Sequence, residues 1–169
     1  DAARTGDGFD FDALMLPLGS EGLRALIAAL NKQGVSQPAV TFLGTGLWDD
    51  PALSTYPPLF GGLFAAPDPA LRADFERRYR DTYAEPPQRL ASLAYDATAL
   101  AAVLARTYEG GGTPYTHAAL THPRGFAGID GIFRFRSDGL SERGLAVLEI
   151  KSGGTRVVDP APAAFSSGS

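Results

Sequence analysis

Short apolar blocks alternate with helical patterns in the first part of the chain. Residues 9–18 are predicted to form a strand buried on both faces, because a continuously apolar block ends there at a proline and a glycine. Ser20 is predicted to cap a helix that follows with apolar residues at helical spacing and closes at Gly34. Two more strands are predicted over the apolar runs 39–43 and 62–66.

A second helix signal begins at Asp68. A carboxylate followed by a proline is typical of a helix start, and aromatic or aliphatic residues then recur every four positions. These recurring residues are Leu71, Phe75, Tyr79 and Tyr83. The spacing also predicts surface ion pairs of Asp74 with Arg78 and of Glu76 with Arg80.

An alanine-rich helix is predicted over 90–108, and a short helix over 116–121. The long helix carries so little polar surface that we expect it to pack on several sides. Asp96 lies within it, and a carboxylate in an apolar setting is costly unless it is paired or reaches water. We therefore expect Asp96 to face a polar seam, a domain boundary or a cap.

The pattern changes after residue 130. Residues 131–136 alternate as in a half-exposed strand, and 137–139 read as a turn. The apolar runs 145–150 and 155–158 flank Ser152-Gly153-Gly154, which indicates a hairpin. Residues 160–169 contain too little apolar content to fold and are predicted to be a disordered or extended tail.

The element order predicts an α/β fold. Strands that alternate with helices imply a mostly parallel, three-layer sheet, here followed by a C-terminal antiparallel β-meander. Three parallel strands are few for this class, so we interpret the sheet as incomplete. The expected organisation is one partial lobe over 1–159 and the tail over 160–169.

Composition excludes several functional classes. The 169 residues are 44% hydrophobic and 20% charged, enough for one globular domain with a core. The net charge is −4 and no basic stripe occurs, so a nucleic-acid partner is not expected. The chain has no cysteine, which excludes disulfides, thiol catalysis and thiolate metal sites.

Enzymatic motifs are weak. Gly44-Thr45-Gly46 follows a strand as a nucleotide-binding loop does, but prolines follow at once where a long helix should start. A nucleotide-binding enzyme stays a minor alternative. His117 and His122 are five residues apart and have no evident third ligand, so no metal site, cofactor or catalytic group is expected.

A binding rim is the stronger candidate. Ligands of open α/β sheets bind beyond the carboxyl ends of the strands, where Thr45, Trp48, Asp49 and Asp68 are expected to gather. An acidic and aromatic rim suits a ligand with an ammonium or planar group. For Asp68 a plain helix cap is the favoured alternative, and for Trp48 a core position is equally compatible with the pattern.

Several segments together resemble the type I periplasmic binding proteins of the Leu/Ile/Val-binding kind. They are LGTGLWDDP (43–51), GGLFAAPDP (61–69), FERRY (75–79), LAYDA (93–97) and GIDGIFRF (128–135). Their order and spacing extend over 11–158. The subgroup most similar is that of the penicillin-binding-protein activators and branched-chain amino-acid receptors.

This resemblance implies two α/β lobes joined by three crossovers that close on a small, amino-acid-like ligand. The chain would then be part of the second lobe, with the N-terminal lobe and the opening strand-helix of the second lobe missing. Thr45, Trp48, Asp49 and Asp68 would be closing contacts, with no catalytic role. The partners implied are the ligand and an ABC transporter permease, and the implied location is the periplasm. The alternative is a lipoprotein-anchored regulator that binds a cell-wall synthase and leaves its cleft unused.

Overall fold

The computed structural model describes residues 4–5, 8–88 and 90–165. The chain folds as two compact units, of which unit 1 comprises residues up to 66 together with 146–160, and unit 2 comprises 67–145 and the residues from 161. The polypeptide therefore passes between the units three times, after residues 66, 145 and 160. The assignment of 1–159 to one partial lobe stays a prediction.

Unit 1 is built on a mixed five-stranded sheet in the order β10-β9-β5-β4-β3. Three strands are parallel, and two antiparallel strands extend the sheet beyond β5. Their bounds are β3 (Ala13–Met15), β4 (Thr41–Gly44), β5 (Leu63–Ala66), β9 (Ala146–Lys151) and β10 (Gly154–Asp159). The α/β prediction is confirmed, but the C-terminal hairpin joins the parallel sheet and is not part of a separate meander. A further two-stranded pair consists of β1 (Arg4–Thr5) and β2 (Gly8–Phe9).

The first predicted strand is shorter and more exposed than its apolar composition indicates. Only 13–15 is a strand, and Met15 is 55% exposed. The expectation of burial on both faces is wrong, since Ala13 and Met15 are exposed; among the described residues β3 pairs with β4 only and forms the edge of the sheet. Apolar composition reports burial against any neighbour, so it does not distinguish a central strand from an edge strand.

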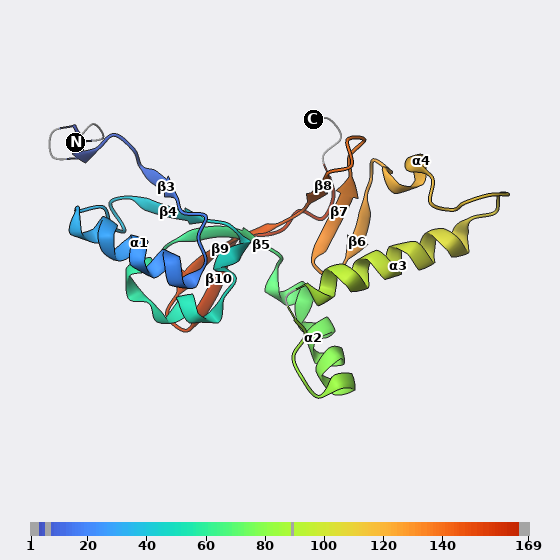
Figure 1. Cartoon of the computed structure of the whole chain (residues 1–169), viewed down its shortest axis with the longest axis horizontal. Helices are drawn as coiled ribbons and strands as arrows, with labels where there is room; N and C mark the ends of the chain where they lie inside the picture. The colour runs from blue at the N-terminus through green and yellow to red at the C-terminus, as the bar shows by residue number, and fades with distance from the viewer. Residues whose placement is uncertain (1–3, 6–7, 89, 166–169) are drawn as a thin grey trace. The chain divides into compact units, whose positions relative to one another are not determined.

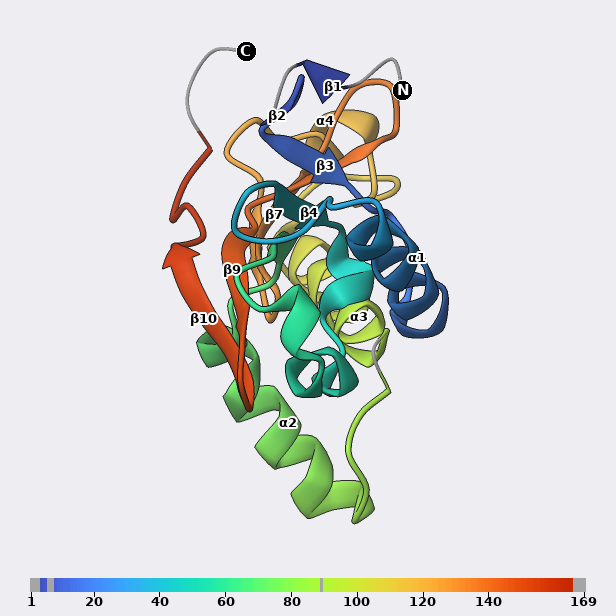
Figure 2. The same cartoon turned by 90° about the vertical axis from the view of Figure 1, so that its left-hand side faces the viewer.

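Helix α1 (Ser20–Lys32) connects β3 to β4 and covers one face of this sheet (Figures 1 and 2). Its side chains Leu23 and Ile27 are completely buried. The N-cap is Gly19, which has no side chain to accept a hydrogen bond, so the predicted cap by Ser20 is wrong by one residue. The Ser20 hydroxyl instead donates to Asp50.

The connection from β4 to β5 consists of three short 3₁₀ helices. They are η1 (Gly46–Trp48), η2 (Pro51–Thr55) and η3 (Pro57–Leu59). Prolines at the first position of η2 and η3 fix the backbone there and prevent a longer helix. The connection is therefore irregular but well packed, with Leu53 and Leu59 buried.

Trp48 anchors this connection in the core of unit 1. Its side chain has no exposed surface and its ring centroid lies 6.4 Å from that of Phe64. A Cβ on Gly44 would lie 2.0 Å from Trp48 Cδ2, and one on Gly62 would lie 2.9 Å from Trp48 Cζ3. The indole thus occupies the space that side chains at Gly44, the last residue of β4, and at Gly62, just before β5, would fill.

We predict that Gly44→Ala destabilises the chain by about 1–3 kcal/mol, because the indole has no room to move away from the added methyl group. Urea unfolding followed by Trp48 fluorescence measures this. The matched control is Gly154→Ala, where a Cβ meets nothing within 4 Å; its effect should stay within about 0.5 kcal/mol. Equal stability of the two variants would contradict the packing described.

Unit 2 consists of helices and a small antiparallel sheet in the order β6-β7-β8. The helices are α2 (Pro69–Tyr83), α3 (Ala91–Thr107) and α4 (His117–Leu120), and the strands are β6 (Phe126–Gly128), β7 (Gly131–Phe135) and β8 (Ser141–Arg143). The three helices and β7 were predicted. Strands β6 and β8 were not, because three residues are too few for an alternating pattern.

Helix α2 begins as its sequence predicts. The Asp68 carboxylate accepts the Ala70 N–H at 2.9 Å and Pro69 occupies the first turn. The predicted ion pairs of α2 are wrong. Asp74 pairs with Arg77 at 2.7 Å, and Glu76 pairs with Arg72 at 3.1 Å. Spacing alone allowed several partners three or four residues apart.

Helix α3 buries one stripe only. Ser92, Asp96 and Leu100 are buried, whereas Tyr95 is 46% exposed and Val103 47%. Packing on several sides, as expected from the alanine content, is therefore not found in the described part of the chain. Alanine permits close packing on any face of a helix but does not require it.

Asp96 acts as a cap for the turn between β6 and β7. Its carboxylate accepts the Ile129 N–H at 2.8 Å, and Gly128 lets it approach, since a Cβ there would lie 2.3 Å from Asp96 Oδ2. Asp130 is also buried and accepts the Ser92 hydroxyl at 2.6 Å. Burial, and secondarily the charge of Asp130, raise the pKa of Asp96. The cap was one of the three settings expected for Asp96, and it lies within unit 2.

We predict that Asp96 lowers stability as the pH rises. A raised pKa means that the folded chain binds the proton more tightly than the unfolded chain, so the contribution is greatest below 3.8 and is lost as the pH rises through the folded pKa. In Asp96→Asn this part of the pH dependence should disappear, while the amide oxygen can still accept the Ile129 N–H. Urea unfolding of both proteins across that pH range measures it, and identical pH profiles would contradict the assignment.

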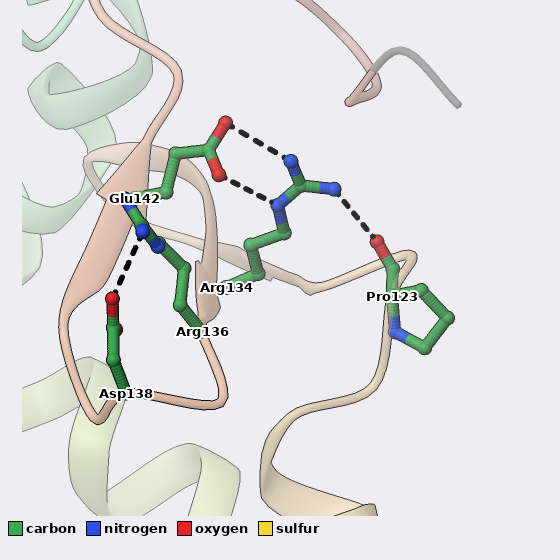
Figure 3. A network of polar contacts seen from close by, with 5 residues as sticks. All are labelled: Pro123, Arg134, Arg136, Asp138 and Glu142. Atoms are coloured by element: carbon green, nitrogen blue, oxygen red, sulfur yellow. Dashed lines mark hydrogen bonds and ion pairs between the residues drawn. The ribbon is translucent and has the colours of Figure 1, made fainter. Parts of the chain in front are cut away.

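The last described residues return to unit 2. The Phe165 ring lies 4.5 Å from the Arg134 guanidinium. That guanidinium pairs with the Glu142 carboxylate at 2.8 Å and 3.1 Å and donates to the Pro123 carbonyl at 3.2 Å (Figure 3). Residues 160–165 contain no helix or strand. That 160–169 form a disordered or extended tail stays a prediction, and 166–169 lie outside the described residues. Within the described residues, no helix is long and apolar enough to cross a membrane.

Candidate functional site

The loops that follow β3 and β4 form one edge of the unit 1 sheet. The two strands are parallel, with Met15 opposite Leu43, so their carboxyl ends lie side by side. This is the edge at which open α/β sheets bind ligands. Two large apolar side chains are exposed on these loops, Leu18 at 39% and Leu47 at 53%.

A carboxylate joins the two loops. Asp50 accepts the Ser20 hydroxyl with one oxygen and the Ala52 N–H, at 2.9 Å, with the other. These two hydrogen bonds, aided by the charge of Arg24, hold the pKa of Asp50 below its usual value. Because both carboxylate oxygens already accept hydrogen bonds, we infer that Asp50 holds the two loops of this rim together and is not a main ligand contact.

Arg24 reinforces the same junction from α1. Its guanidinium donates to the Ala52 carbonyl at 2.5 Å and lies 4.9 Å from the centre of the Tyr56 ring. The start of α1 is thereby joined to η2 at several points. Sequence reasoning missed the roles of Ser20, Arg24 and Asp50. The signal for Asp50 was its position before Pro51, where it caps η2 as Asp68 caps α2.

The four predicted site residues lie in different settings. Thr45 caps η1, its hydroxyl oxygen accepting the Leu47 N–H at 3.3 Å, and Asp49 is half-buried at the end of η1. Trp48 is fully buried, so its indole supports the rim from below. Asp68 caps α2 and belongs to unit 2. The structure thus brings Thr45, Trp48 and Asp49 together on one loop, and their ligand contacts stay a prediction.

Gly44 of the Gly44-Thr45-Gly46 segment has a packing role. The segment leads into the 3₁₀ helix η1 and not into an α-helix whose N–H groups could hold phosphate. The face of Gly44 is occupied by Trp48. The local geometry therefore gives the nucleotide-binding alternative no support.

The two histidines belong to unit 2. His117 begins α4, and His122 Nδ1 accepts the Arg124 N–H at 3.3 Å. Among the residues that the structure describes, no group of three histidine or acidic side chains could hold a metal ion.

The family model for periplasmic binding proteins matches residues 8–155. The chain belongs to the periplasmic binding protein family. The resemblance seen in the sequence is thereby confirmed at the family level, while its subgroup remains a prediction.

Solved structures of this family share the fold. A putative branched-chain amino acid ABC transporter protein from Rhodospirillum rubrum superposes with a TM-score of 0.71 at 22% identity, over 87% of this chain and 44% of that one. A leucine-binding protein from Thermotoga maritima gives 0.55 at 22% identity, over 86% and 43%. A branched-chain amino acid substrate-binding protein from Streptococcus pneumoniae, in complex with isoleucine, gives 0.54 at 21%, over 90% and 46%. The chain thus spans less than half the length of these relatives. No curated protein matches it.

We predict that Asp50 contributes stability that is lost in acid. Its folded pKa is depressed, so the contribution is complete above 3.8 and disappears as the pH falls through the folded pKa. Asp50→Asn should therefore lose less stability than the parent chain on acidification below 3.8. Ser20→Ala should raise the pKa of Asp50, which carboxyl NMR titration reports directly; an unchanged pKa would contradict the bridging role of Ser20.

Proposed function

We propose that the protein containing this chain is a periplasmic solute-binding protein that delivers a small amino-acid-like ligand to an ABC transporter. The observation that carries the proposal is the rim of unit 1, where two loops at the carboxyl ends of parallel strands are joined by Ser20 and Asp50. A rim held in this way is arranged before the ligand arrives, which lowers the cost of binding. The family's usual location supports the periplasm.

The connectivity of the chain supports this proposal. The polypeptide passes between the two units three times, and two of the three crossings contain a proline, at Pro67 and Pro160. Several short connections allow two units to change orientation while each stays intact.

The chemistry of the rim favours a ligand with an apolar group. Leu18 and Leu47 are the large exposed side chains on these loops, and the carboxylate of Asp50 is already engaged. The Thr45 hydroxyl oxygen accepts a backbone N–H, which leaves its proton free to donate to a ligand oxygen. Thr45, Asp49 and Asp68 remain our proposed polar contacts, with Trp48 as their support.

A second lobe would complete the binding protein. Apolar residues follow one another at spacings of three or four from the N-cap of α3 into the helix: Leu90, Leu93, Ala97, Ala101 and Leu104. Leu90 is 66% exposed and Leu93 36%, so the stripe offers an apolar surface that a neighbouring lobe could bury. We propose that the N-terminal lobe of the parent protein packs there. The alternative role as a regulator of a cell-wall synthase, with a lipoprotein anchor, has no structural observation in its favour.

We predict that the full-length protein binds leucine or isoleucine more tightly than glutamate or lysine. Isothermal titration calorimetry with each amino acid measures this. Leu47→Asp should weaken binding by about tenfold or more, because it replaces an apolar contact with a charge that must be desolvated. Leu140→Asp is the control, since Leu140 is 62% exposed on unit 2 and outside the rim. Absence of binding to any amino acid, or equal affinity of the Leu47 and control variants, would overturn the proposal.

A further inference from the structure

A second concave site lies within unit 2, between α2 and α3. Its volume is about 490 Å³, within the range of small-molecule sites. One face of α2 provides most of the large side chains, and one face of α3 provides mostly small ones. The lining residues are Phe75, Arg78, Tyr79, Thr82 and Tyr83 of α2, with Ala91, Ala94, Tyr95 and Thr98 of α3. We call this site the α2–α3 groove.

Aromatic rings form a continuous wall in the groove. The ring centroids of Tyr83 and Tyr79 are 4.6 Å apart, those of Tyr79 and Phe75 5.9 Å, and those of Phe75 and Tyr95 5.4 Å. Phe75 is buried, while Tyr83 is 62% exposed and Tyr95 46%. The row is therefore buried at Phe75 and exposed at both ends, and an accessible aromatic surface of this kind suits a planar aromatic ligand.

The charge in the groove is positive. Among the residues that the structure describes, Arg78 is the one cationic side chain that lines the groove, and no acidic side chain lines it. Arg78 donates from Nε to the backbone carbonyl of Asp74 at 3.3 Å, while the carboxylate of Asp74 pairs with Arg77. Within the described residues Arg78 thus has no carboxylate partner. Its terminal nitrogens remain available for a planar anion, which guanidinium groups bind through two parallel hydrogen bonds.

The hydroxyl groups of the two threonines in the groove are not available to bind this anion, because both already donate to backbone carbonyl oxygens. Thr82 donates to the Arg78 carbonyl and Thr98 donates to the Ala94 carbonyl, both at 2.8 Å. We propose that the α2–α3 groove binds a planar aromatic carboxylate, with the ring on the tyrosine wall and the carboxylate on Arg78. This site is separate from the rim of unit 1 and does not depend on the solute-binding role.

The test is calorimetry of the purified chain with 2-naphthoate, compared with the neutral 2-naphthamide and the non-aromatic cyclohexanecarboxylate. We expect binding of 2-naphthoate, at least tenfold weaker binding of each comparison compound, and about a tenfold loss in Arg78→Gln. Arg80→Gln is the matched control, because Arg80 is exposed on the same helix and outside the groove. It should bind as the parent chain does.

A blocking variant tests the location. Ala94→Trp fills the groove and should abolish binding, whereas Ala102→Trp, on an exposed position of α3 outside the groove, should not. The proposal is overturned if 2-naphthoate does not bind, if the amide binds equally well, or if Arg78→Gln has no effect. Self-association of the chain that Ala94→Trp prevents would assign the groove to a second copy and would also overturn it.

Discussion

The structure of unit 1 depends on the burial of one indole ring. Trp48 lies in the space left open by Gly44 and Gly62 and packs against Phe64, so both of these positions must lack a side chain. This packing draws the loop after β4 down onto the sheet. Thr45 and Leu47, which precede the indole, are consequently held at the carboxyl edge of the strands, where a ligand can meet them.

Carboxylates in this chain fix loops in two opposite ways. Asp50 receives a hydroxyl and a backbone N–H at a partly open rim, and its charged form is favoured. Asp96 is 4% exposed and lies near Asp130, so its charged form is disfavoured although it also accepts a backbone N–H. An aspartate thus holds the rim of unit 1 and the turn of unit 2 in place, but the negative charge is favoured at Asp50 and disfavoured at Asp96. An acidic residue near a strand end is therefore weak evidence for recognition of an ammonium group.

The sequence allowed prediction of the elements with strong local signals. Asp68 and Pro69 start α2 as predicted because an N-cap and a first-turn proline act within a few residues. The edge position of β3 and the pairing of β5 with β9 could not be predicted, because they depend on hydrogen bonds between residues far apart in the chain. For Trp48 the pattern left core and rim equally open, since only the three-dimensional neighbours of Gly44 and Gly62 decide between them. The junction of Ser20 with Asp50 was missed for the same reason: thirty residues separate the two.

The most direct test of this account uses Trp48, the one tryptophan of the chain, which lies beneath the proposed ligand rim. In a full-length protein in which any further tryptophan has been replaced, its emission should be that of a buried indole and should change saturably when an apolar amino acid is added. The concentration of half-saturation should equal the dissociation constant from calorimetry. Calorimetric binding without any change in Trp48 emission would place the ligand elsewhere and contradict the account.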